Sequence, residues 1–444
     1  MSKIVFFAST PISHIIPLKP IFEYLKQNNH EIHCFSDLKN KEIIMKMGAL
    51  FHEYPEGIYR ELGSINTSYS VEASKLWSKN KMIEGYEFYL EKDTEYFYNI
   101  GTSKIIEMKS IIEQINPEVI FRDSTDKIGY YVTNLSTRSP MVIGYITHNL
   151  YSKSFFDQNP RQLYSLLMNA KIDKNEGLAS YFENYRERVS FYNEKIANEK
   201  NVPKLNILHQ FDPMTKYTII FSTDYFQPSC AFDSNRDYQI IYPEHSRFQV
   251  EENIDNNLEN FINQNSSPII YIASGSIISY PLERYINYLL GLTQSNCRVI
   301  ISCKNYYKEL NEMVKYVLKK ENVYIDQYVP QKYVLSKSNL FISSGGQNSI
   351  IESIYFQIPL LIDPITSEQR LNGILVEELD IGRTLAGINS RNTNVGKIIN
   401  DIFKSSTIKK NLQFYSKDIE KHENDFSFLE NIFNDLKGKK YEKD

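Results

Sequence analysis

Short apolar runs that alternate with helical segments constrain the fold of this chain more than any other feature. Residues 4–8 form an unbroken apolar run of the kind found in the central strand of a parallel sheet. Apolar residues at helical spacing follow in 17–29, residues 31–35 repeat the strand pattern, and 43–47 belong to a second helix. Alternation at this period predicts a doubly wound α/β domain.

Two longer segments interrupt this pattern, which then restarts in the second half of the chain. In the first half, strand candidates 118–121 and 141–145 lie between long helical segments at 70–115 and 151–200. In the second half the strand candidates are 269–273, 298–302, 323–325, 340–342 and 360–362, with a helix near 281–294. The polar, turn-rich stretch 233–237 predicts the end of the first domain.

The length of the chain agrees with this division. A chain of 444 residues suits two domains better than one core. We therefore expect an α/β protein of two Rossmann-like domains, 1–238 and 239–444, that face each other across a cleft. The end of the chain is predicted to be helical and to pack outside its own sheet.

Composition excludes several classes of function. The chain has 50 Lys and Arg against 54 Asp and Glu, without long single-sign blocks. This balance argues against nucleic acid as a partner. The cysteines Cys34, Cys230, Cys297 and Cys303 are scattered without metal-type spacing, so we expect them to be reduced and buried. A signal-peptide pattern is absent and no apolar run approaches the ~18 residues of a membrane span, which predicts a soluble, cytoplasmic protein.

One strand-to-helix junction in the second half is suited to bind a diphosphate. The apolar strand candidate runs into Gly345 and Gly346, and a helical segment begins at once after them. Glycines let backbone N–H groups approach a diphosphate, and the helix N-terminus adds partial positive charge. Asn348 and Ser349 are donors at the mouth of that helix, and Glu352, one turn deeper, suits a ribose. The alternative is a plain turn, with Glu352 favouring the helix dipole.

A second junction follows at residues 362–369. Ser367 is a plausible N-cap, which would project Glu368 and Gln369 at the carboxyl edge of the sheet, where ligands of such folds bind. An acid beside an amide suits sugar hydroxyls. A Glu in a first helical turn is also ordinary helix chemistry, so this alternative stays open.

These segments carry a resemblance to a known family. The run from Tyr328 to Gln369 resembles the donor signature of the UDP-glycosyltransferase superfamily of GT-B fold, particularly its bacterial macrolide-glycosyltransferase branch. The matching motifs are Tyr328-Val329-Pro330-Gln331, Ser344-Gly345-Gly346-Gln347-Asn348-Ser349, Glu352, Pro359 and Glu368-Gln369. Weaker similarity continues over nearly the whole chain.

The resemblance implies roles for individual residues in nucleotide-sugar binding by the C-terminal domain. Tyr328 would stack on the base, Gln331 would contact base or ribose, and Glu352 would hold the ribose. Ser276, Asn348 and Ser349 would hold the phosphates, and Ser344, Gly345 and Gly346 belong to the same nucleotide-binding segment. Glu368 and Gln369 would bind the sugar hydroxyls.

The resemblance also assigns the catalytic pair to an acceptor-binding N-terminal domain. His14, directly after the first strand candidate, matches the family's catalytic base, and Asp123, which also ends a strand candidate, matches its orienting acid. A hydroxyl is a poor nucleophile near neutral pH, so a His must take its proton, and a carboxylate behind the imidazole fixes its tautomer. His148, at another strand end, either lines the acceptor pocket or is structural.

Two departures from the family pattern leave an alternative open. Tyr328 replaces the usual Trp, and Ser344 replaces the His that usually contacts the diphosphate. A non-catalytic GT-B homologue that serves as an auxiliary partner of another enzyme would also explain Ser344. A lipid acceptor at a membrane surface is disfavoured, because the first domain lacks a clear basic and apolar patch.

The sequence therefore predicts an inverting, metal-independent glycosyltransferase without a cofactor. It would move a hexose from a nucleotide-diphosphate sugar, with a UDP-sugar favoured, to a hydroxyl of a small natural product or antibiotic. The sequence leaves open the base, the sugar, the acceptor and the oligomeric state.

Overall fold

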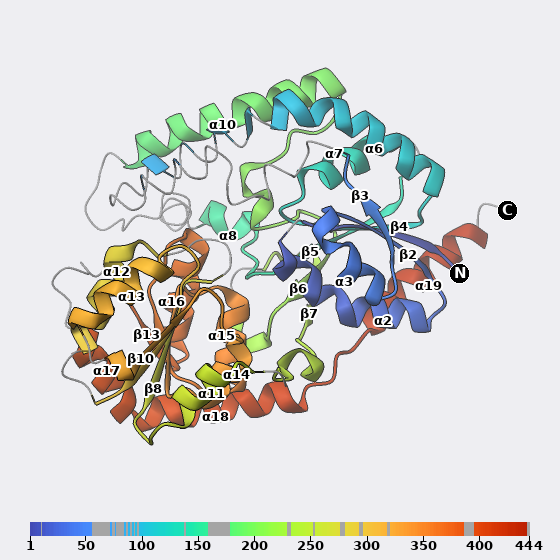
Figure 1. Ribbon diagram of the computed structural model, residues 1–444. Helices are drawn as coiled ribbons and strands as arrows, with labels where there is room; N and C mark the ends of the chain where they lie inside the picture. Colours follow the sequence, from blue (N-terminus) through green and yellow to red (C-terminus); the bar gives the residue numbers. More distant parts are fainter. Residues whose placement is uncertain are drawn as a thin grey trace.

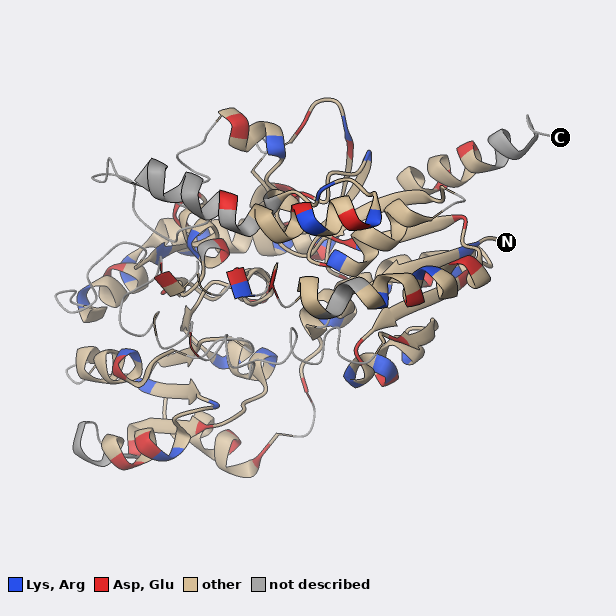
Figure 2. Cartoon of the chain, turned by 90° about the horizontal axis from the view of Figure 1, so that it is seen from above, with Lys and Arg blue, Asp and Glu red and all other residues tan. Residues whose placement is uncertain are grey.

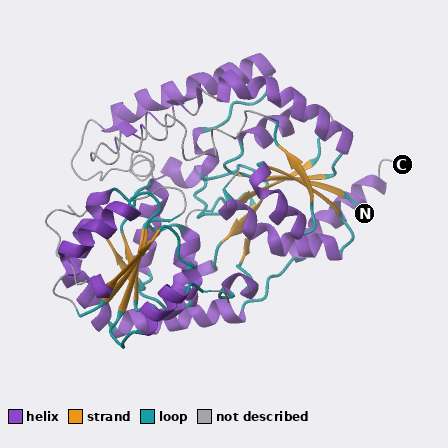
Figure 3. Ribbon diagram, viewed as in Figure 1, coloured by secondary structure: helices purple, strands orange, loops and turns teal. Residues whose placement is uncertain are grey.

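The computed structural model describes residues 1–9, 11–55, 97–136, 139–158, 178–228, 232–251, 254–275, 280–292, 296–317, 320–385 and 395–441, with isolated positions between 72 and 95. These residues form two parallel sheets, one in each half of the chain, and helices cover both faces of each (Figures 1 and 3). This is the predicted arrangement of two Rossmann-like domains.

The N-terminal sheet has the strand order β3-β2-β1-β4-β5-β6-β7, with all neighbouring pairs parallel. Its strands are β1 (Lys3–Phe7), β2 (Glu31–Ser36), β3 (Leu50–Glu53), β4 (Val119–Asp123), β5 (Met141–Ile146), β6 (Tyr217–Phe221) and β7 (Asp237–Ile241). The order reverses direction between β1 and β4, so the loops that follow these two strands lie side by side. Ligands of open α/β sheets bind at such a switch point.

Helices cover both faces of this sheet. Successive apolar residues of β1 point to opposite faces, so each face needs a helical layer to bury them. Ile4 and Phe6 pack with α2 (Lys19–Gln27), and Val5 and Phe7 pack with α6 (Thr102–Ile115) and α7 (Lys127–Leu135). The other described helices of this half are α1 (Ile12–Ile15), η1 (Ile16–Leu18), η2 (Leu38–Asn40), α3 (Lys41–Lys46), η3 (Phe97–Gly101), α8 (Lys153–Gln158), α10 (Leu178–Lys200), η4 (Ile207–Gln210) and η5 (Asp224–Phe226).

The C-terminal sheet has the order β10-β9-β8-β11-β12-β13 and is also parallel. Its strands are β8 (Ile269–Ala273), β9 (Arg298–Ser302), β10 (Val323–Asp326), β11 (Leu340–Ser343), β12 (Leu360–Ile362) and β13 (Gly382–Thr384). The helices of this half are η7 (His245–Phe248), α11 (Asn256–Asn263), α12 (Leu282–Leu292), α13 (Tyr307–Val317), η8 (Lys320–Asn322), α14 (Gln331–Lys337), α15 (Gln347–Tyr355), α16 (Ser367–Glu378), α17 (Val395–Lys404), α18 (Ser406–Lys421) and α19 (Ser427–Tyr441). Its switch point lies between β8 and β11, so β11 delivers the glycine turn there.

Segments at both ends of the predicted second domain pack with the N-terminal domain. The boundary predicted at 238 falls inside β7, because β7 pairs with β6 and completes the N-terminal sheet. At the other end, Leu429, Ile432 and Phe433 of α19 belong to the core of the N-terminal domain. Figure 1 shows α19 beside the N-terminal sheet, far from α17. The last helix thus packs outside its own sheet, as predicted, and ties the two domains together.

Lys and Arg are interspersed with Asp and Glu over the chain (Figure 2). Cys34, Cys297 and Cys303 are buried and free, whereas Cys230 lies outside the described residues. Over the described part of the chain, no helix has the length and apolar character that a membrane span requires.

Candidate active site

His14 and Asp123 meet at the switch point of the N-terminal sheet. His14 lies in α1, which begins shortly after β1, and Asp123 is the last residue of the neighbouring strand β4. The two groups are 2.8 Å apart, from His14 Nδ1 to Asp123 Oδ2. Asp123 is fully buried, and its Oδ1 accepts hydrogen bonds from the backbone N–H and the hydroxyl of Thr125, each at 2.8 Å.

Each member of this pair shifts the pKa of the other. Burial alone raises the pKa of Asp123, but His14 and the hydrogen bonds from Thr125 outweigh it, so the pKa is lowered. Burial alone lowers the pKa of His14, but the charge and hydrogen bond of Asp123, with a smaller contribution from Glu368, leave it raised. Since an ionised carboxylate only accepts, Nδ1 carries the hydrogen, and the neutral ring leaves the lone pair on Nε2. This is the tautomer that a general base needs.

The glycine turn after β11 has the geometry that a phosphate site requires. Gly345 has a φ of +91°, and a Cβ there would lie 2.7 Å from Ile362 Cγ2 and 3.1 Å from the carbonyl oxygen of Gln369. Gly346 is the N-cap of α15, and no side chain in the described part of the chain caps it. The first backbone N–H groups of α15 are therefore left to bind an anion.

The two glycines predict a matched pair of variants. Gly345→Ala should destabilise the protein by about 2–4 kcal/mol, because it combines a left-handed backbone with steric overlap. Gly346→Ala should cost under about 1 kcal/mol, since no atom lies within 4 Å of the added Cβ. Its methyl group would stand at the mouth of α15, so the donor KM should rise. Thermal unfolding and donor KM check both, and a G346A variant with an unchanged KM would contradict the phosphate role of this turn.

The residues predicted to hold base and ribose lie together. Gln331, the first residue of α14, donates from Nε2 to Glu352 Oε2 at 2.7 Å and to Ser349 Oγ at 3.3 Å. The Tyr271 hydroxyl approaches Gln331 Oε1 at 3.5 Å. Tyr328 stands close by in sequence with its side chain 74% exposed, which leaves its ring face open to a planar ligand.

Ser344 does not take the place of the family's His. Its side chain is buried, and its hydroxyl donates to the carbonyl oxygen of Ser274 at 2.7 Å. This hydrogen bond joins the ends of the neighbouring strands β11 and β8. The hydroxyl hydrogen is therefore engaged by the backbone of the neighbouring strand, which argues against a phosphate contact from this atom.

This arrangement predicts a small effect of Ser344→Ala on the donor. The variant should lose about 1 kcal/mol of stability, because the Ser274 carbonyl loses its partner. The donor KM should stay within about twofold of the parent's, because the lost energy belongs to the fold. A tenfold rise in KM at normal stability would show instead that the hydroxyl contacts the donor.

Glu368 and Gln369 differ in which side-chain atoms remain available to a ligand. The N-cap of α16 is Thr366 and not Ser367 as predicted, because a capping box joins Thr366 to Gln369. Gln369 Oε1 accepts from the backbone N–H groups of Ile365 and Thr366 at 2.8 and 3.0 Å. Glu368 is half-buried, and its charge favours the protonated forms of His14 and His148 in the other domain.

Two predicted residues remain to be placed, and no metal site accompanies them. Asn348 is half-buried in the first turn of α15, beside the glycine turn. Ser276 lies outside the described residues. Within the described ranges, no group of three or more His, Cys, Asp or Glu side chains is arranged to hold a metal ion.

Several residues of this region were not predicted from the sequence. Asn372 and Asn149 are buried and join the domains through a hydrogen bond of 3.0 Å. Buried Gln347 donates to the Phe221 carbonyl at 2.8 Å, also between domains. Asn372 could have been found, because it lies four residues after Glu368 and therefore on the same helix face. The partners of Asn149 and Gln347 lie in the other domain, which local sequence does not reveal.

A polar cavity of about 390 Å³ in the N-terminal domain is separate from this site. It is lined by Arg122, Tyr130, Thr133, Asn134, Val142, Lys204, Asn206, His209, Met214 and Thr215. Arg122 and Asp123 are adjacent in β4, so their side chains point to opposite faces of the sheet. Arg122 donates to the carbonyl of Pro213 at 2.8 Å. The cavity therefore lies behind the sheet as seen from His14.

Known proteins match both the donor half and the whole fold. Residues 246–421 match the family model described as UDP-glucoronosyl and UDP-glucosyl transferase. UDP-glycosyltransferase UGT4 of Dactylopius coccus is 22% identical, and the alignment covers 93% of this chain and 81% of that protein. Among solved structures, the glycotransferase of kitacinnamycin has a TM-score of 0.69 at 14% identity, covering 98% of this chain and 99% of that one. Spinosyn rhamnosyltransferase SpnG, in structures complexed with spinosyn aglycone and with thymidine diphosphate, has a TM-score of 0.57 at 12% identity, with 95% and 96% covered.

These matches agree with the motifs and with the arrangement of the sheets. The family model covers the strands and turns that carry the donor signature, and the UGT4 alignment extends through the N-terminal domain. The solved structures share the fold over nearly the full length. The chain is therefore a glycosyltransferase of GT-B fold whose C-terminal half matches the UDP-glucoronosyl and UDP-glucosyl transferase family model.

Proposed function

We propose that this enzyme transfers a hexose from a nucleotide-diphosphate sugar to a hydroxyl of a small natural-product aglycone, with inversion at the anomeric carbon. The observation that carries the proposal is the hydrogen-bonded pair of His14 and Asp123, which interacts electrostatically with Glu368 of the donor domain. This supports a base in one domain that acts beside a carboxylate of the other, and we propose that this carboxylate binds the sugar.

The proposed reaction is a single displacement. His14 Nε2 takes the proton of the acceptor hydroxyl, whose oxygen forms a bond to the anomeric carbon. The bond from that carbon to the diphosphate oxygen breaks, and the nucleoside diphosphate leaves with the electron pair. Asp123 stabilises the imidazolium as it forms. Attack on the face opposite the leaving group inverts the configuration.

Different residues of the C-terminal domain suit different parts of the nucleotide sugar. The exposed ring of Tyr328 offers a stacking face for the base, and Glu352 with Gln331 offers polar atoms to the ribose. The N-terminus of α15 carries partial positive charge for the leaving diphosphate, so the proposal requires no metal. Glu368 accepts from sugar hydroxyls, whereas Gln369 can offer only its NH₂ group because its oxygen caps α16.

Similarity to named proteins narrows the substrate classes. The family model and UGT4 carry UDP in their names, and SpnG is seen with thymidine diphosphate. A UDP-sugar is the donor that we favour, with a thymidine diphosphate sugar as the competitor. SpnG in complex with spinosyn aglycone supports a natural-product acceptor.

The auxiliary, non-catalytic alternative receives less support. Ser344 was its motivation, and the hydroxyl of Ser344 has a structural role between two strands. A protein that only binds a partner has no need for a buried carboxylate oriented on a histidine. The pair of His14 and Asp123 favours an enzyme.

Donor screening tests the proposal. The full chain is incubated with UDP and thymidine diphosphate sugars, with and without a panel of hydroxylated macrolide and phenolic aglycones, and in the presence and absence of EDTA. We expect stabilisation by one nucleoside diphosphate in thermal unfolding, slow donor hydrolysis alone, and EDTA-insensitive transfer to an aglycone. An absence of stabilisation, hydrolysis and transfer with every donor would refute the proposed function.

A further inference from the structure

A buried pair of asparagines joins the two domains beside the proposed sugar site. Asn149, just after β5, is 2% exposed, and Asn372, in α16, is fully buried. The Nδ2 of Asn149 donates to the Oδ1 of Asn372 at 3.0 Å. A buried amide costs free energy unless it is hydrogen-bonded, so this contact favours the arrangement in which the domains touch.

Asn372 also holds the two donor-side elements that matter for the sugar. Its Nδ2 donates to the carbonyl oxygen of Gly345 at 2.9 Å and to Glu368 Oε1 at 3.1 Å. With the bond accepted from Asn149, one side chain thus contacts the glycine turn, the sugar-binding carboxylate and the opposite domain. Both of its amide hydrogens and its oxygen are engaged.

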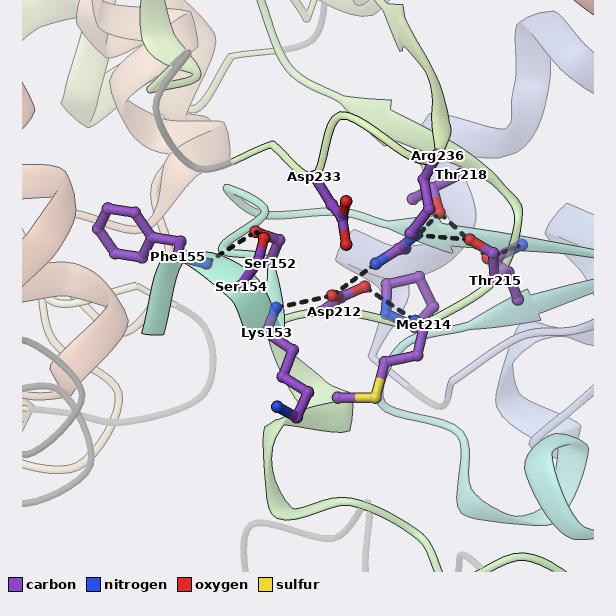
Figure 4. Close-up of polar contacts among 12 residues, drawn as sticks. Ser152, Lys153, Ser154, Phe155, Asp212, Met214, Thr215, Thr218, Asp233 and Arg236 are labelled. Atoms are coloured by element: carbon purple, nitrogen blue, oxygen red, sulfur yellow. Dashed lines mark hydrogen bonds and ion pairs between the residues drawn. The ribbon is translucent and has the colours of Figure 1, made fainter. Parts of the chain in front are cut away.

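Several hydrogen bonds hold the segment of the N-terminal domain that carries Asn149. Leu150 exchanges two hydrogen bonds with the side chain of Gln227, at 2.8 and 2.9 Å. Figure 4 shows the next anchor, where Asp212 accepts from the Lys153 backbone N–H at 3.0 Å. Asp212 is fixed in turn by an ion pair with Arg236 at 2.6 Å. The segment that carries Asn149 is therefore a firm support and not a free loop.

We propose that Asn372 is a positioning residue that, through Asn149, sets Glu368 and the glycine turn in register with the His14 domain. The role rests on the proposed function, because it matters only if a sugar held by Glu368 must meet His14. The residues that we propose bind the nucleoside diphosphate all lie in the C-terminal domain. Loss of the bridge should therefore reduce kcat and leave nucleotide affinity unchanged.

Asn149→Ala tests the bridge while keeping the donor-side bonds of Asn372. We expect kcat for transfer to fall about 10- to 100-fold, because a small misplacement of the reacting groups is costly. The affinity for UDP or thymidine diphosphate, measured by titration, should stay within about twofold of the parent's. Asn193→Ala and Asn411→Ala are matched controls, since each removes an Asn side chain that donates to a backbone carbonyl away from the interface.

Asn372→Asp gives a second, pH-dependent readout. The introduced carboxylate still accepts from Asn149, but it opposes the carboxylate of Glu368 and the carbonyl of Gly345. We expect a larger loss of kcat than in N149A. Relative to the parent at the same pH, the variant should recover part of its kcat as the pH falls and one carboxyl group of the pair becomes protonated. A variant-to-parent ratio of kcat that stays constant with pH would contradict a role of Asn372 that acts through Glu368.

Hydrogen exchange provides a measurement that needs no substrate. Backbone amides of the glycine turn and the first turn of α16 should exchange faster in N149A, although the substitution lies in the other domain. An active parent whose N149A variant keeps both its kcat and this protection would overturn the bridge alone. A parent inactive with every donor would overturn the proposed function and the catalytic role of the bridge together, while exchange would still report the coupling.

Discussion

Replacement of His14 by alanine is expected to lower kcat for glycosyl transfer by about 10²- to 10⁴-fold. The acceptor hydroxyl keeps its proton near neutral pH unless a base within hydrogen-bond reach removes it. His14 is the imidazole that Asp123 orients, and the hydrogen bond between them leaves Nε2 as the acceptor. The loss should appear in kcat, since the residues proposed to bind the nucleotide lie in the other domain.

The measurement is the initial rate of aglycone-dependent nucleoside diphosphate release. Titration with the nucleoside diphosphate should give equal affinities for H14A and the parent. His422→Ala is a matched control, because His422 follows the last residue of α18 and stacks on Tyr242. This variant should keep the kcat of the parent. Full transfer by a correctly folded H14A variant would show that another group removes the proton.

Replacement of Asp123 by asparagine is expected to lower kcat by about 10³- to 10⁴-fold. The amide can stabilise the wrong tautomer of His14, and it cannot stabilise the imidazolium. Asp123 also raises the pKa of His14 against the effect of burial. Without the carboxylate the pKa of His14 should fall, because only burial and weaker charges remain.

The sign of the pH effect follows from this change. A general base works when it is unprotonated, so kcat/KM of the parent should rise with pH through a His14 pKa above the usual value of about 6.5. In D123N this acidic limb should move to lower pH, while the plateau is reduced. Asp425→Asn is a suitable control, because Asp425 is exposed and accepts hydrogen bonds from the backbone N–H and the hydroxyl of Ser427 in its own turn. An acidic limb at the same pH in D123N and the parent would exclude His14 as the titrating base.

The sheets were largely predictable because buried parallel strands leave an unbroken apolar signal. The strand candidates at 4–8, 269–273 and 340–342 correspond to β1, β8 and β11. Strand β6 was missed, although its run Tyr217–Phe221 carries the same signal. Strand β7 mixes Asp and Gln with apolar residues at the sheet edge, so its pattern resembles a turn. This is why the predicted domain boundary fell inside it.

The site was predictable where a motif sets the backbone and unpredictable where tertiary contacts decide. Sequence placed His14 and Asp123 at strand ends, and the adjacency of β1 and β4 then brought them together across 109 positions. It could not reveal that the Ser344 hydroxyl turns to Ser274, because that partner lies 70 positions away. The oxygen of Gln369 was similarly lost to a helix cap. Side-chain hydrogen bonds of this kind depend on packing, which pattern alone does not specify.

The anomeric configuration of the product tests the central claim most directly. The parent enzyme is supplied with an α-linked nucleotide hexose and an aglycone, and the glycoside is examined by proton NMR before it can equilibrate. Single displacement with His14 as the base predicts a β-linked product. An α-linked product would require a mechanism with net retention and would contradict the account.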